Sequence, residues 1–195
     1  MNARTIRFAA LSLAATSLAC TKSQVQHAPS PSPSAPAASL PTPPTMAATT
    51  AIATIRDGAG RTVGTVNLID TYSGVLLTGA VNDLGLGVHG IHVHAVGKCE
   101  APFTSAGPHF NPMNRQHGFR NAMGPHLGDL PNLDTPAAGA LRFEVLLPGV
   151  TLKGTNALLD ADGAAIVIHA TKDDYTTDPS GNSGGRIACG VITAR

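Results

Sequence analysis

The chain has 195 residues, of which 43% are hydrophobic, 4% aromatic and 13% charged, with 21 Gly, 15 Pro and no Trp. This composition disfavours a coiled coil or a charge-rich helical bundle and favours strands and loops. All 12 acidic residues lie at or after Asp57, so the part from Ala47 onward has 10 basic and 12 acidic residues and a formal net charge of −2. A mildly acidic folded part lacks the basic surface of a nucleic-acid-binding protein, and we exclude that class.

The first 19 residues have the pattern of a signal peptide. Arg4 and Arg7 precede an apolar run at 8–19. This run is shorter than the about 20 residues that span a bilayer, but it suits the core of a secretory leader. Cys20 follows Ala19 as in a lipoprotein, whereas Ser17 stands where lipoproteins usually carry an aliphatic residue, so ordinary signal-peptidase cleavage also fits. We therefore expect an exported protein of the periplasm or cell envelope.

Residues 20–46 have the composition of a tether. Seven of the 15 prolines lie between positions 28 and 45, among Ser, Ala and Thr, so we expect this segment to be disordered. A tether directly after Cys20 favours a lipid on that cysteine, which would anchor the protein to a membrane. A secreted protein with a disordered tail is the alternative.

The remaining residues, 47–195, are the size of one domain. They contain two cysteines, Cys99 and Cys189. In an oxidising compartment an even pair of cysteines favours a disulfide over two free thiols. In the chain-entropy model, a bridge over this separation contributes about 4 to 5 kcal/mol to stability, less any strain.

Short runs rich in Val, Ile, Leu and Thr predict eight strands, most of them separated by turns that contain glycine. They lie at 50–55, 62–69, 75–81, 88–94, 140–147, 151–158, 164–170 and 186–193. Short strands at this spacing predict an all-β fold, an antiparallel sandwich or barrel. The interval 97–135 lacks alternation and holds three of the eight histidines, and a loop of that length inside a domain is usually functional or disordered. The histidines favour a functional loop over a disordered one.

Several histidines have the spacing of metal ligands. His92 and His94 are one residue apart in a β-patterned run, so their side chains leave the same face about 6.6 to 6.8 Å apart along the strand and can converge on one metal. Alone, such a pair is a weak signal, and surface or core histidines are the alternative. His169 ends an apolar run and could add a third imidazole, although a polar residue there also suits a plain strand end.

The long loop carries a second set. His109, His117 and His126 follow one another at intervals of eight and nine residues, and Asp129 comes three residues later. Zinc accepts three imidazoles and a carboxylate readily, because it favours tetrahedral nitrogen and oxygen donors. A polar loop with scattered histidines is the alternative, but it leaves unexplained why so little other charge accompanies them.

Together these motifs resemble one family. The His92-Val93-His94 pair, the four loop residues, His169 and the segment Gly181-Asn182-Ser183-Gly184-Gly185-Arg186-Ile187-Ala188-Cys189-Gly190 occur in the order found in bacterial exported copper/zinc superoxide dismutases. The resemblance implies a flattened eight-stranded Greek-key β-barrel with long metal-binding loops, and one copper and one zinc ion per chain. It implies copper ligands His92, His94, His109 and His169, and zinc ligands His109, His117, His126 and Asp129.

The resemblance also implies an enzyme. Superoxide dismutases are oxidoreductases that convert two superoxide ions and two protons to dioxygen and hydrogen peroxide while copper is alternately reduced and oxidised. By resemblance, His109 bridges the metals and delivers a proton, and Arg186 docks the superoxide anion. Asp173, rather than the adjacent Asp174, matches an outer carboxylate that accepts hydrogen bonds from one copper and one zinc ligand.

By the same resemblance Cys99 and Cys189 form the disulfide, and the chain could form a homodimer. One alternative is a cell-envelope protein that binds copper and zinc without fast dismutation. Such a protein would usually lack copper ligands or the arginine, which are present here. A structural adhesive module is a second alternative, and it explains the strands and the tether but none of the candidate ligands.

Overall fold

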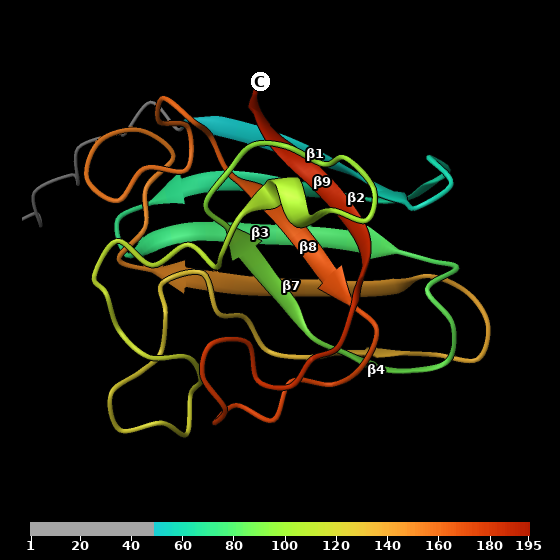
Figure 1. Ribbon diagram of the computed structural model, residues 1–195. Coiled ribbons are helices and arrows are strands. Elements are labelled where there is room, and N and C mark those ends of the chain that lie inside the picture. The colour runs from blue at the N-terminus through green and yellow to red at the C-terminus, as the bar shows by residue number, and fades with distance from the viewer. Residues whose placement is uncertain (1–48) are drawn as a thin grey trace, which may run out of the picture. The chain divides into compact units, whose positions relative to one another are not determined.

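Seven strands form one curled antiparallel sheet in the computed structural model, which describes residues 49–195 (Figure 1). Along the sheet the order is β5-β8-β9-β1-β2-β3-β7, and a separate two-stranded sheet pairs β4 with β6. The strands are β1 (Thr50–Asp57), β2 (Thr62–Thr71), β3 (Gly74–Val81), β4 (Gly87–His89), β5 (Ile91–His94), β6 (Leu133–Thr135), β7 (Leu141–Pro148), β8 (Ala165–His169) and β9 (Arg186–Ala194). The all-β fold class is therefore confirmed.

Alternating apolar residues of these strands build the core. On β1, Ala51, Ala53 and Ile55 are buried while the residues between them are at least partly exposed, because successive side chains of a strand point to opposite faces. Ile91 and Val93 of β5 join the same core. The only helix within residues 49–195 is a 3₁₀ turn, η1 (Thr104–Ala106), and no helix of that part of the chain is long and apolar enough to cross a membrane.

Three strand predictions need correction. The predicted strand 88–94 is two strands, because the chain leaves the β4–β6 pair at Gly90, whose N–H donates to the carbonyl of Thr171 instead. Residues 151–158 form no strand, since Gly154 and Asn156 have positive φ and only one isolated bridge joins Thr151 to Ala157. The long loop, predicted without strands, contributes the short strand β6.

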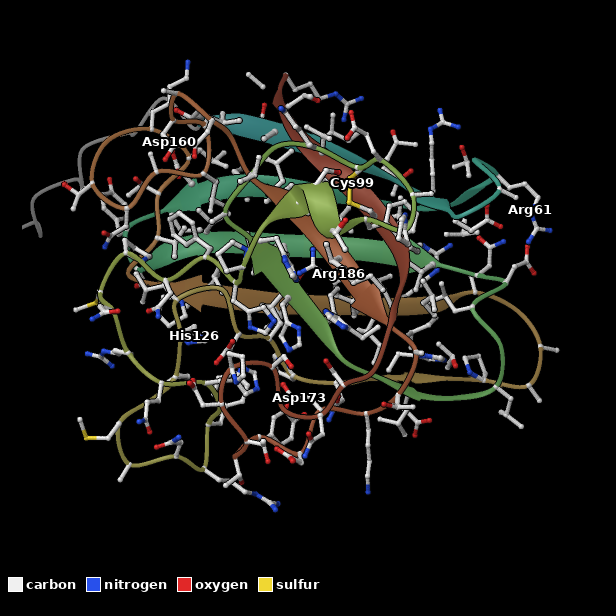
Figure 2. All side chains as sticks on the ribbon, viewed as in Figure 1. Arg61, Cys99, His126, Asp160, Asp173 and Arg186 are labelled. Carbon is white, nitrogen blue, oxygen red and sulfur yellow. A yellow bond between two sulfur atoms is a disulfide. The ribbon has the colours of Figure 1, made fainter. Side chains whose placement is uncertain are left out.

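A disulfide joins Cys99 to Cys189, as the sequence predicts. It fastens the loop after β5 to β9, and this loop packs on the sheet through a small cluster that includes Phe103, Ala106 and Val167. In Figure 2 Cys99 lies above Arg186, which bonds the carbonyl of Phe103 in the same loop. The disulfide thus holds the loop against β9 and against its neighbour β8, which ends at His169.

Edge strand β5 is covered by the long loop. Val93 donates its N–H to the carbonyl of Gly128 and accepts the N–H of Phe110, both at 2.8 Å. Isolated bridges join His92 to Asp129 and His94 to His109. The backbone therefore sets loop residues in register with the two strand histidines. The predicted signal peptide, the tether and Cys20 lie outside the described residues.

Candidate metal centre

Strand β5 presents two buried histidines to the loops. His92 and His94 are both 0% exposed, and Ile91 and Val93 point into the core from the opposite face, as the alternation predicts. Strand β8 pairs with β5 on one side and with β9 on the other, and its register with β9 shifts at a bulge between Ile168 and His169. A bulge redirects a side chain at a strand end, and His169 here joins the two β5 histidines.

Four imidazoles form the first candidate group. His92, His94, His109 and His169 are all buried, and one nitrogen of each lies within 4.8 Å of the others. The ring centroids of His92 and His109 are 4.0 Å apart, and those of His92 and His169 are 4.8 Å apart. The structure therefore brings together residues from β5, β8 and the long loop.

Each of these rings has one engaged and one free nitrogen. His94 donates from Nδ1 to the carbonyl of Gly107 at 2.9 Å, and His169 donates from Nδ1 to the carbonyl of Gly184 at 3.2 Å. His92 uses Nε2 toward Asp173, and His109 has Nδ1 3.1 Å from Asp129. The opposite nitrogens, His92 Nδ1 and Nε2 of His94, His109 and His169, are buried with no hydrogen-bond partner. Four buried lone pairs without donors fit a metal that prefers imidazole, such as copper.

The second group has the spacing of a tetrahedral zinc site. Nδ1 of His109, His117 and His126 lie 3.1, 3.0 and 3.4 Å from Oδ1 of Asp129, and the Nδ1 atoms of His109 and His126 are 3.4 Å apart. With zinc–ligand bonds of about 2.0 to 2.1 Å, adjacent tetrahedral ligands lie about 3.3 to 3.4 Å apart. The donor types and distances therefore fit zinc.

His92 also lies within 4.8 Å of His109, His117 and Asp129, so distance alone would admit it to this group. Its Nε2 is bonded to Asp173 and its Nδ1 is one of the four unpartnered nitrogens of the first group. His126 has a ring nitrogen 3.4 Å from Asp129, and we assign it to the second group for that reason.

Burial and the carboxylates set the protonation of these residues before a metal binds. Burial lowers the pKa of His94 to about 2, of His109 to about 4 and of His169 to about 3. Burial also acts on His117, but hydrogen bonds to Asp129 and Asp173 outweigh it and raise its pKa to about 9. The first group is thus neutral and ready to ligate at pH 7, whereas His117 must release a proton to bind a metal.

This geometry fits a protein that binds copper and zinc, and comparison with known proteins establishes the family. The family model described as copper/zinc superoxide dismutase (SODC) matches residues 62–192. The chain belongs to the copper/zinc superoxide dismutase family. It is accordingly a superoxide dismutase, an oxidoreductase that acts on superoxide and uses copper and zinc.

Relatives of this superoxide dismutase come from several bacteria. The chain is 47% identical over 137 residues to superoxide dismutase [Cu-Zn] 1 of Aquifex aeolicus, covering 68% of this chain and 81% of that protein. It is 43% identical to superoxide dismutase [Cu-Zn] of Caulobacter vibrioides, covering 73% and 84%. A solved structure of a SOD-like protein from Bacillus subtilis matches with a TM-score of 0.70 and 39% identity, covering 73% of this chain and 97% of that one.

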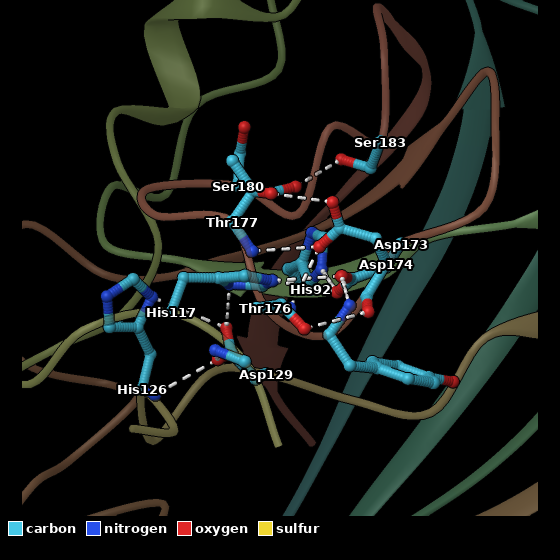
Figure 3. A network of polar contacts seen from close by, with 12 residues as sticks. His92, His117, His126, Asp129, Asp173, Asp174, Thr176, Thr177, Ser180 and Ser183 are labelled. Carbon is cyan, nitrogen blue, oxygen red and sulfur yellow. Dashed lines mark hydrogen bonds and ion pairs between the residues drawn. The ribbon is translucent and has the colours of Figure 1, made fainter. Parts of the chain in front are cut away.

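Asp173 links the two histidine groups of the dismutase. Its buried carboxylate accepts from His92 Nε2 at 2.8 Å and from His117 Nε2 at 3.0 Å, and its backbone neighbour Tyr175 donates an N–H to it (Figure 3). Burial opposes this charge, but the hydrogen bonds hold its pKa well below the ordinary value. The adjacent Asp174 instead accepts from Thr176 and Thr177 in its own exposed turn.

Arg186 begins β9 and is half-buried beside the first group. Its Nη1 and Nη2 donate to the carbonyls of Phe103 and Gly107 at 2.6 and 2.7 Å. Gly107 also accepts from His94, so one carbonyl joins the arginine to a histidine of the first group. Burial lowers the pKa of Arg186, but a guanidinium remains cationic.

Two residues of the site were missed at the sequence level. The side chain of Asn132 forms two hydrogen bonds with the backbone of Asp173: its Oδ1 accepts the N–H at 2.8 Å, and its Nδ2 donates to the carbonyl at 2.9 Å. Asp178 contacts two histidines of the second group. The only sequence signal for Asn132 is its position three residues after the candidate ligand Asp129. Asp178 had no such signal, because it lies 61 residues from its partner His117.

Proposed function

We propose that this superoxide dismutase is exported and removes superoxide at the cell envelope, with its two metals held by the two histidine groups. Copper is bound by His92, His94, His109 and His169, and zinc by His109, His117, His126 and Asp129. The observation that carries this proposal is that each of the four proposed copper ligands has one buried ring nitrogen without a hydrogen-bond partner. Within residues 49–195 one further buried side-chain nitrogen lacks a partner, Nε2 of His89, and His89 belongs to neither histidine group. His109 supports the proposal further, because its Nε2 is one of the four nitrogens on the copper ligands while its Nδ1 lies among the zinc-group atoms.

Bound copper would supply the alternating one-electron reduction and oxidation that turns two superoxide ions and two protons into dioxygen and hydrogen peroxide. The residues of the chain orient the donors and move the proton. Asp173 and the carbonyls of Gly107 and Gly184 fix which nitrogen of His92, His94 and His169 carries hydrogen. His109 Nε2 is the atom that can hold and release a proton at the copper side, because Nδ1 of the same ring faces Asp129 and the zinc group.

Arg186 supplies positive charge for an anionic substrate. Two carbonyls hold its guanidinium in place next to His94, so the docking charge is oriented before superoxide arrives. A fixed cation above a buried site raises the capture rate of an anion by roughly 10- to 1,000-fold at low salt. We therefore assign Arg186 to superoxide docking.

The leader favours export to the periplasm or cell envelope, and the tether after Cys20 favours a lipid anchor there. A mass increment on Cys20 in the mature protein would establish the anchor, and an unmodified cysteine would rule it out. Analytical ultracentrifugation would distinguish a monomer from a homodimer, which are the two alternatives for the oligomeric state.

The deciding experiment measures dismutation and metal content together. The full chain is prepared free of metal, loaded with copper and zinc, and assayed for superoxide removal while bound metals are quantified. We expect turnover only when about one copper per chain is bound. Full loading without turnover would support an envelope metal-binding protein instead.

A variant of one copper ligand sharpens the assignment. His169→Gln should abolish copper-dependent turnover while zinc stoichiometry stays near one, because the His169 side chain contacts Gly184 and no residue of the zinc group by hydrogen bond. Full turnover in this variant would remove His169 from the copper ligands.

A further inference from the structure

Asp178 lies where the segment after Asp173 crosses the zinc group. Its Oδ1 accepts the backbone N–H of His117 at 2.6 Å. The same oxygen lies 3.7 Å from Nε2 of His126. The Asp178 side chain is 45% exposed while that of His126 is 6% exposed, so the carboxylate reaches the buried ring from the solvent side.

The position of Asp178 matches a chemical need of His126. His126 turns Nδ1 toward His109 and Asp129, so Nδ1 is the nitrogen available to zinc. A neutral imidazole that ligates through Nδ1 carries its hydrogen on Nε2. That N–H therefore lies on the side of the ring where the Asp178 carboxylate stands. Carboxylates in this place fix the orientation of a ligating histidine and make it a stronger donor.

Asp178 also holds His117, at a different group from the one that Asp173 contacts. Asp173 bonds the His117 ring at Nε2, and Asp178 bonds the backbone N–H of the same residue. His117 is thus held at the ring and at the main chain by two carboxylates of one segment. This arrangement limits movement of the loop around His117.

We propose that Asp178 is a positioning residue of the zinc site, which holds the main chain of His117 and polarises His126 through its charge. The inference rests on the zinc ligands assigned in the proposed function. At 3.7 Å the contact with His126 is longer than a hydrogen bond, so it is electrostatic in this structure and is weakened by solvent.

Two variants separate the two roles. Asp178→Asn keeps an oxygen that can accept the His117 N–H but removes the charge opposite His126, and Asp178→Ala removes both. Losing an outer partner of a metal ligand typically costs roughly 10- to 100-fold in metal affinity, and the half-exposed carboxylate favours the lower end. We expect about a 10-fold loss for Asp178→Ala and a smaller but measurable loss for Asp178→Asn.

The control is Asp162→Asn. Asp162 lines the same open cleft as Asp178, His126 and Arg115, but within residues 49–195 no hydrogen bond or ion pair joins its carboxylate to a histidine. It therefore reports the effect of removing one negative charge from the cleft, and we expect unchanged zinc affinity.

The full chain is titrated with zinc against a chelator of known affinity, and then with cobalt(II), whose visible absorption reports the geometry of a tetrahedral site. The proposal requires weaker zinc binding and a shifted cobalt spectrum in Asp178→Asn. An Asp178→Asn variant that matches the wild type in both readouts overturns it, because the charge then contributes nothing. A wild type without a tetrahedral cobalt spectrum overturns the zinc assignment itself, and this inference with it.

Discussion

Asp173→Asn tests whether one buried carboxylate serves both metals. The carboxylate accepts three hydrogen bonds, from His92 Nε2, His117 Nε2 and the N–H of Tyr175. An amide offers one acceptor oxygen and one NH₂ group in the same space. If the oxygen keeps its bonds to Tyr175 and His117, the NH₂ group faces the N–H of His92, and two donors then oppose each other.

The expected magnitude follows from these contacts. His92 would have to reorient or bind its metal through a less suitable tautomer, and His117 would lose a charged acceptor. Losing the hydrogen-bond partner of a metal-ligating histidine costs roughly 10- to 100-fold in metal affinity, or about 1.4 to 2.7 kcal/mol of binding free energy, and here this applies to both histidines. We expect weakened binding of both copper and zinc, with the larger effect on copper.

Competition titrations with chelators at fixed pH measure the two affinities. The matched control is Asp174→Asn, because Asp174 is the neighbouring carboxylate and bonds only its own turn and Asn182 within the described residues. Its metal affinities should equal those of the wild type. Equal losses in the two variants, or none in Asp173→Asn, would refute the reasoning.

Three further predictions address substrate, disulfide and pH. Arg186→Glu should slow dismutation and weaken or reverse its dependence on ionic strength, measured by stopped-flow; an unchanged salt profile would contradict docking. Cys189→Ser should lower the free energy of unfolding by about 4 kcal/mol and reduce turnover, since the freed loop carries the carbonyl acceptors of Arg186, and denaturant titration checks the first effect. In the metal-free protein the lowered pKa values of His94 and His169 mean that the unfolded chain takes up protons near pH 6.5 while the folded chain does not. Lowering the pH from about 6.5 to 4.5 should therefore reduce the free energy of unfolding, by up to about 1.4 kcal/mol per pH unit for each histidine that stays neutral in the folded chain, and a flat profile in denaturant titrations would contradict this.

The alternation of apolar and polar residues was sufficient to predict most strands and the pairing of His92 with His94 on one face. Alternation in the run 91–94 placed Ile91 and Val93 in the core and His92 and His94 together on the other face, as the structure shows. The same logic failed at 151–158. There Leu152 and Leu158 are buried, but Gly154 and Asn156 bend the chain, so the apolar pattern reflects burial of a loop and not a strand.

Contacts between distant segments set the limit of prediction at the site. Sequence position could not distinguish Asp173 from Asp174, because only the fold shows which carboxylate faces two histidines. Gly181 illustrates the reason. Its φ is +64° and a Cβ there would collide with the Asp173 carboxylate, so the close approach depends on a glycine eight residues away. Asp178 was missed for the same reason, since nothing local connects it to His117.

Coverage of edge strand β5 by the long loop has a consequence for the protein before it acquires metals. The loop segments that donate to and accept from Val93 belong to the same loop as the proposed zinc ligands. If the loop detaches while the metals are absent, β5 presents unpaired N–H and C=O groups, and such an edge is a template for pairing with another chain. Zinc binding would then protect the protein from aggregation as well as build its active site, and a metal-free chain should aggregate faster than a zinc-loaded one under conditions where both remain folded.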